Sequence, residues 1–185
     1  MKKLFRILGY MVYIPAAILF LFELYRTAMV IIPQYQQYKW FVIGMAGYYI
    51  LGVFFKKNRK FLQTFSHELT HTIVAMLFLR KMHSFTAERG EGVMTYTTGR
   101  FRLGSTMISL SPYFLPIFTI FFMLIRHVVV GDAVYIFDAL IGFTFAFHLG
   151  CFAAQTGSYQ TDIQQNGLFY SYLIITTFLA LNISI

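Results

Sequence analysis

Residues 65–74 of the 185-residue chain read FSHELTHTIV, within a mainly apolar segment. His67 and His71 are four residues apart, so on an α-helix they project from nearly the same face. Two imidazoles one turn apart can hold a single zinc ion, and the intervening Glu68 can act as a general base on a water held by that ion. Titratable groups inside an apolar helix are costly unless they serve a metal or a polar pathway. The pattern therefore predicts a metal site on a membrane-embedded helix.

The composition of the whole chain is typical of a membrane protein. Hydrophobic residues make up 58% of the sequence and charged residues 12%, whereas soluble domains have about 45–50% and about 25%. The chain has too few charges to cover a soluble globule, and it is too apolar to be disordered. Its single cysteine, Cys151, excludes a disulfide scaffold. The net charge of +8 therefore indicates an orientation toward anionic lipid and the cytoplasm, and we expect no nucleic-acid partner.

Six hydrophobic segments are expected to form helices. Several are shorter than the ~20 residues that a perpendicular span needs. The first follows a basic amino terminus, as a signal peptide does, but Glu23 and Arg26 stand where small residues would prepare cleavage, so we expect a retained helix. In the second, Gly44, Gly47 and Gly52 are spaced for close helix contact. The segments comprise residues 7–22, 40–55, 61–79, 105–125, 133–152 and 168–185.

Two stretches between these segments are not expected to cross the membrane. Residues 80–103 carry hydrogen-bonding side chains at 95–98 and several glycines, which predicts a small β-hairpin with a turn near Gly90–Gly92. Residues 153–167 are rich in Gln, Thr, Ser and Gly and predict a polar loop. The sequence thus predicts one all-α polytopic membrane domain over residues 1–185, with about six helical segments and a small β-hairpin after the motif helix.

The motif and its surroundings resemble the site-2 protease family of intramembrane zinc metalloproteases. The resemblance rests on the HELTH run of residues 67–71 in an apolar helix, followed about ten residues later by the short β region. It continues with the Ser-Leu-Ser-Pro run of residues 109–112, which is similar to the start of that family's next helix. It ends at Asp162, about ninety residues beyond the histidines, where the family supplies its third zinc ligand. The resemblance covers residues 61–167 in all.

Two residues near the end of this region have alternative interpretations. The family usually places its aspartate in a proline-rich stretch followed by glycine, whereas Asp162 has neither neighbour, and it could instead cap the amino terminus of the last helix. His148 lies in an apolar run. It is either a buried histidine with one hydrogen bond, a metal ligand, or a group that orients Asp162 or substrate.

The resemblance implies a zinc metalloendopeptidase in a minimal form without a soluble accessory domain. His67, His71 and Asp162 would hold the zinc, and Glu68 would act as general base and proton shuttle. The substrate would be a membrane-embedded protein or peptide, hydrolysed near the cytoplasmic side. The expected location is the lipid bilayer of a bacterial cytoplasmic (inner) membrane, a prediction from the small size and the charge pattern. The sequence does not predict an oligomeric state.

Two other functions fit the same residues. A metal-binding or transport protein could use His67 and His71 together with Asp138 or His148 along a permeation path, because an intramembrane acid such as Asp138 needs a partner. A non-catalytic membrane scaffold could carry the motif without using it. Zinc content and cation flux distinguish these functions from a protease.

The distribution of cations leaves two arrangements for the hairpin. If the motif helix crosses completely, cations divide almost evenly between the two sides of the membrane. If it crosses only in part, most cations lie inside, and Asp162 approaches from the same side as the histidines. We prefer this second arrangement as a hypothesis. A cytoplasmic hairpin could pair with an unwound substrate by strand addition, although a hairpin that only covers this face fits the sequence equally.

Overall fold

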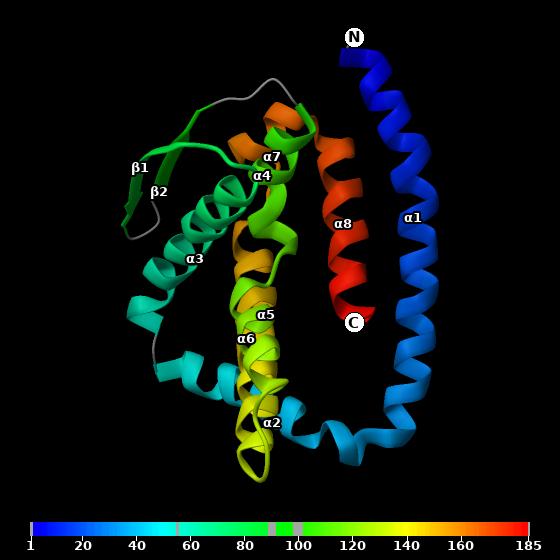
Figure 1. Ribbon diagram of the computed structural model, residues 1–185, viewed down its shortest axis with the longest axis vertical. Helices are drawn as coiled ribbons and strands as arrows, with labels where there is room; N and C mark the ends of the chain where they lie inside the picture. The colour runs from blue at the N-terminus through cyan, green and yellow to red at the C-terminus, as the bar shows by residue number, and fades with distance from the viewer. Residues whose placement is uncertain (1, 55, 89–91, 98–101, 185) are drawn as a thin grey trace.

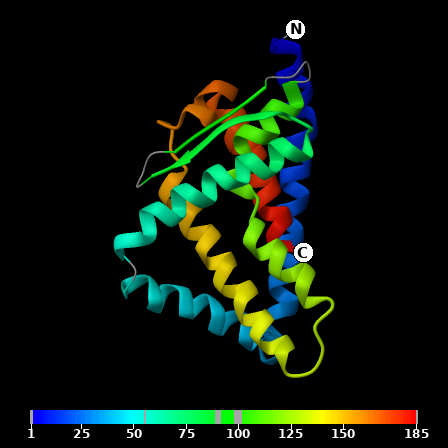
Figure 2. The ribbon, with the colours of Figure 1, turned by 60° about the vertical axis from the view of Figure 1, so that its left-hand side comes forward.

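The computed structural model describes residues 2–54, 56–88, 92–97 and 102–184. The chain is mostly helical with one small two-stranded sheet (Figure 1). Helices α1 and α8 lie side by side, and α4 and α7 lie near the end of the molecule that holds the amino terminus (Figures 1 and 2). Helix α3 runs obliquely from the middle of the molecule to α4. The elements are α1 Lys2–Ile31, η1 Ile32–Gln34, α2 Tyr35–Phe54, α3 Lys56–Leu77, β1 Met82–Ala87, β2 Gly92–Tyr96, α4 Arg102–Phe114, α5 Ile117–Arg126, α6 Ala133–Gln155, α7 Thr161–Asn166 and α8 Leu168–Ser184.

Two helical stretches of the described chain are long and apolar enough to cross a membrane. One is Ile7–Phe54, which comprises most of α1 together with η1 and α2, and the other is α6. The bent pair α4–α5 makes a third if it counts as one span. The first predicted segment, 7–22, is therefore only part of a longer helix. Glu23 and Arg26 lie inside α1, where they form an ion pair of 2.9 Å.

The predicted segment 105–125 is not one continuous helix. It is divided into α4 and α5, which are bent by 78° relative to each other. Leu115 and Pro116 occupy the break. A proline lacks the N–H that would continue the helix, and it disfavours helical backbone in the residue before it. The single predicted segment is therefore a bent pair of helices, either a broken span or a re-entrant loop.

Helix α3, which carries the motif, is not among the candidate spans. Its sequence from Lys56 to His71 is largely polar, so its hydropathy is too low. The side of the membrane on which the hairpin lies stays a prediction.

Helices α2 and α6 cross so closely that side chains are excluded at the crossing. A methyl group at Gly44 would overlap the main chain of Ala139, and one at Gly142 would overlap that of Phe41. The predicted close contact is thus confirmed at Gly44. Positions 47 and 52 have open space around them, so the prediction is wrong for these two glycines.

The predicted β-hairpin is confirmed. Strands β1 and β2 pair antiparallel, from Met82 opposite Tyr96 to Ala87 opposite Gly92. Of the predicted turn, Gly92 alone lies within the described residues. The sheet lies against α3 (Figure 2), and the Phe85 ring meets the Phe65 ring of that helix edge to face at 6.0 Å.

Helix α4 lies at the centre of the packing around the motif. On one side, Ile108 packs with Val74 and Ala75 of α3. On the other, α4 contributes to a second core with α7 and α8, made of Leu110, Tyr113, Phe114, Ile163, Tyr170, Ile174 and Ile175. One helix therefore joins the element that carries the histidines to the element that carries Asp162.

The prediction of a polar loop over residues 153–167 is wrong in part. Helix α6 continues to Gln155, and Thr161–Asn166 form α7. This short helix is held because Ile163 is fully buried in the core, and it ends at Gly167, whose φ of +92° suits glycine. Asp162 lies in the first turn of α7 rather than at the start of α8, so it does not cap the last helix.

Candidate metal centre

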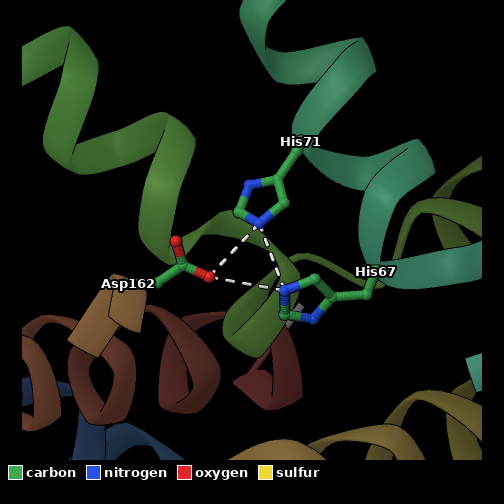
Figure 3. A group of neighbouring side chains, drawn as sticks. All are labelled: His67, His71 and Asp162. Atoms are coloured by element: carbon green, nitrogen blue, oxygen red, sulfur yellow. Dashed lines mark hydrogen bonds and ion pairs between the residues drawn. The ribbon is translucent and has the colours of Figure 1, made fainter. Parts of the chain in front are cut away.

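Three side chains from two distant parts of the chain converge on one point (Figure 3). The Nε2 atoms of His67 and His71 are 3.1 Å apart. The Oδ2 atom of Asp162 lies 3.5 Å from the first of these nitrogens and 3.4 Å from the second. Helix periodicity explains the pairing of the histidines, and α7 delivers the carboxylate. These residues are the three that the sequence predicted as metal ligands.

The spacing of these atoms fits a tetrahedral zinc site. Ligand atoms at the zinc bond length of about 2.0–2.1 Å lie roughly 3.3 Å from one another in a tetrahedron. The three separations of 3.1, 3.4 and 3.5 Å match this value. Two imidazoles and one carboxylate are also a donor set that zinc accepts, and a tetrahedral ion would keep a fourth position for water. These residues could therefore hold zinc.

The orientation of His71 is fixed by a main-chain carbonyl. Its Nδ1 atom donates to the oxygen of Ile108 at 2.8 Å, so Nε2 keeps its lone pair for the centre of the cluster. In a regular helix this oxygen would accept from the N–H of residue 112, but that residue is Pro112. The proline thus leaves the carbonyl available to His71. The hydroxyl of Ser111 also donates to it at 2.8 Å.

The Asp162 carboxylate is partly buried, and its surroundings favour the ionised form. Burial by itself would raise the pKa of Asp162, but hydrogen bonds with His67 and His71 outweigh it and hold the pKa below its usual range. The hydroxyl of Tyr113 donates to the same Oδ2 atom at 3.4 Å. An ionised carboxylate is the form that binds a metal.

Glu68 lies next to the two histidines and is itself buried. A methyl group at Gly92 would overlap its carboxylate, so strand β2 lies directly against it. Burial raises the pKa of Glu68 above its ordinary value. A carboxylate with a raised pKa is a stronger base, as general-base catalysis near neutral pH requires.

The other two candidates of the sequence lie outside the cluster. Within the described residues, His148 is buried in α6, its Nε2 atom has no hydrogen-bond partner, and it is not one of the three grouped side chains. Asp138 has the partner that an intramembrane acid needs, since Arg126 donates to it at 2.9 Å.

The sequence did not indicate two groups that the structure brings to the site. These are the carbonyl of Ile108 and the side chain of Tyr113, both on α4. The run at 109–112 was expected to begin the next helix, but it lies near the carboxyl end of α4. A proline leaves the carbonyl four residues before it without its helical N–H donor. Pro112 therefore indicated that the carbonyl of Ile108 would be free to accept another hydrogen bond. Nothing local indicated which side chain would use that carbonyl.

The Peptidase M50B-like family model matches residues 46–154, more than half of the chain. The chain belongs to this family. Membership confirms the resemblance to site-2 proteases, implies a metallopeptidase, and agrees with the apolar spans, because the family is embedded in membranes. No curated protein and no solved structure matches the chain. The matched region holds the motif, the hairpin and α4, whereas Asp162 lies beyond it.

Proposed function

We propose that this protein is an intramembrane zinc metalloprotease that hydrolyses a peptide bond of a membrane-embedded protein or peptide near the cytoplasmic side. The observation that carries the proposal is the convergence of His67, His71 and Asp162 at zinc-like separations, with Glu68 beside them. Membership of a metallopeptidase family supports it independently.

The residues of the site divide the chemistry among them. When bound, zinc supplies a Lewis acid and an activated water at neutral pH. Glu68 takes the proton of the attacking water and returns it to the leaving amine, a role that its raised pKa favours. Asp162 and the Nε2 lone pair of His71, which its bond to Ile108 preserves, would provide two of the three metal contacts. His67 provides the third.

The hairpin offers a way to present the substrate. A peptide bond inside a transmembrane helix is shielded by its own hydrogen bonds, so the substrate must unwind near the site. Because Gly92 lies against Glu68, a peptide added to the sheet as a further strand would pass close to the proposed base. The bilayer of a bacterial cytoplasmic membrane is the proposed location, and a membrane-embedded chain is the proposed partner.

The decisive experiment compares the purified wild type with Glu68→Gln in liposomes that contain a panel of single-span reporter proteins. We expect cleavage of at least one reporter by the wild type, and a loss of at least about 100-fold in the variant, since general-base catalysis contributes 10²–10⁴. The variant should still bind zinc. Equal cleavage by both proteins would end the proposal.

Two further readouts separate the alternatives. Cation flux into liposomes that survives Glu68→Gln would favour transport. Absence of stoichiometric zinc, with unchanged stability after His67→Ala, would favour a scaffold.

A further inference from the structure

We propose that Tyr113 is a positioning residue of the metal centre, whose hydroxyl holds the carboxylate of Asp162 and whose ring holds His67. The inference rests on the proposed zinc site and concerns how the ligands are kept in place. Tyr113 lies on α4, whereas the two residues that it contacts lie on α7 and α3. One side chain therefore touches two of the three proposed ligands.

The contact with Asp162 acts on the oxygen that faces the histidines. The Tyr113 hydroxyl donates to Oδ2 at 3.4 Å, and both histidine Nε2 atoms approach the same Oδ2. A carboxylate oxygen has two lone pairs, so it can accept from the phenol and still bind a metal. Tyr113 is only 1% exposed, and a buried hydroxyl without an acceptor is costly. The hydroxyl and the carboxylate thus fix each other.

The contact with His67 replaces a hydrogen bond that this ring lacks. His71 is oriented by its bond to the Ile108 carbonyl, but within the described residues the Nδ1 atom of His67 is buried and has no hydrogen-bond partner. The ring of Tyr113 meets the His67 ring edge to face, with 5.3 Å between centroids and 80° between planes. An edge-to-face contact of this kind is favourable and restricts rotation of the imidazole.

Helix α7 needs this support because it has only six residues. At its carboxyl end, Asn166 donates to the Ser109 hydroxyl at 2.7 Å and accepts from Thr106 at 2.9 Å, both on α4. Near its amino end, Tyr113 holds the Asp162 side chain. The matched family region includes Tyr113 but not Asp162. Tyr113, which fixes Asp162, therefore lies inside the region that matches the family, whereas Asp162 itself lies beyond that region.

The test is Tyr113→Phe, which removes the hydroxyl and keeps the ring. Zinc affinity, measured with the metal alone by competition with a chelator, should fall about 10-fold, as is typical when a group that orients a metal ligand is lost. The visible absorption spectrum of the cobalt-substituted protein should shift, because the carboxylate changes its orientation. The matched control is Tyr13→Phe, which lies on α1 and whose ring packs on Tyr170 and Phe178 of α8. It should change neither quantity.

A double variant separates positioning from general packing. If Tyr113 acts through Asp162, Tyr113→Phe should cost less than about 2-fold in zinc affinity in an Asp162→Ala background, instead of about 10-fold. Equal losses in both backgrounds, or an unchanged affinity and cobalt spectrum in the single variant, would overturn the proposal. Should the Phe variant fail to fold, 3-fluorotyrosine at position 113 keeps the shape and alters the donor, and an unchanged cobalt spectrum would then overturn it. A wild type that binds no zinc would refute the proposed function itself, which distinguishes the two failures.

Discussion

The main-chain oxygen of Ile108 accepts a hydrogen bond of 2.8 Å from Nδ1 of His71, one helix away. Such carbonyls are normally occupied by the N–H four residues later in the same helix. Pro112 has no N–H, so α4 lacks the hydrogen bond that would occupy the Ile108 carbonyl. This carbonyl therefore stays available to accept from His71 of α3. The proline thereby acts on the metal centre through the Ile108 carbonyl.

Replacing Pro112 by alanine should weaken zinc binding without destabilising the protein. The variant adds an N–H donor to an oxygen that already accepts from His71 and Ser111, and an oxygen has only two lone pairs. Zinc affinity should fall by up to about 10-fold, the usual range when a contact that orients a ligand is disturbed. The melting temperature of the metal-free protein should not fall, since alanine is better than proline inside a helix. Chelator competition and thermal unfolding measure the two quantities.

The control for this prediction lies in the preceding residue. Ser111→Ala in the Pro112→Ala chain removes one of the three donors and should restore most of the zinc affinity. An affinity for Pro112→Ala equal to that of the wild type would contradict the role of the free carbonyl.

The local parts of the site could be predicted from the sequence, because helix periodicity alone brings His67 and His71 together. Asp162 came from the family resemblance and not from a local pattern. The distance of Asp162 from the histidines depends on how α7 packs. That packing depends on Ile163, which is buried against α4. The contribution of Tyr113 depends on the same packing. A sequence pattern carries no information on which buried hydroxyl meets which carboxylate.

The sequence predicted where most helices lie, but it did not predict where each helix begins, ends or breaks. Hydropathy identified the apolar runs, but it did not show that α1 continues through Glu23 and Arg26, whose mutual ion pair makes them tolerable there. It also treated residues 105–125 as one segment, since Pro116 is a single residue in a strongly apolar run. The mainly helical fold with its small sheet was therefore predictable, whereas the number of spans, the breaks and the short α7 depended on individual residues and tertiary contacts.

Removing the metal should destabilise the wild type and leave ligand variants unchanged. A metal that binds only the folded state stabilises it in proportion to its affinity. A strong zinc chelator should therefore lower the melting temperature of the wild type in detergent. It should have a much smaller effect on His71→Ala or on Asp162→Ala, whose zinc affinity should be reduced but still measurable with added zinc. A wild-type melting temperature that is insensitive to the chelator, at a measured zinc content of zero, would argue against a metal centre.

A methyl group at Gly44 should loosen the crossing of α2 and α6. It would overlap the main chain of Ala139, so the helices must separate. Overpacking of this kind typically costs about 1–3 kcal/mol, which exceeds the ~1 kcal/mol that alanine gains over glycine in a helix. Gly44→Ala should therefore lower the melting temperature. Gly47→Ala lies on the same helix with open space around it, and it should not lower the melting temperature. Equal stability of the two variants would mean that the close crossing does not limit stability.

A methyl group at Gly92 should impair catalysis while leaving zinc in place. It would overlap the carboxylate of Glu68, which must then move away from the position that the proposed base occupies. A displacement of about 1 Å can cost on the order of 100-fold in rate, so the cleavage rate of a reporter substrate should fall by up to that factor. The zinc stoichiometry should stay at that of the wild type, because none of the three ligand atoms is touched. Val93→Ala is the matched control, since it alters the next, exposed side chain of the same strand and should keep the wild-type rate. Full activity of Gly92→Ala would show that the contact between the hairpin and Glu68 does not set the position of the base.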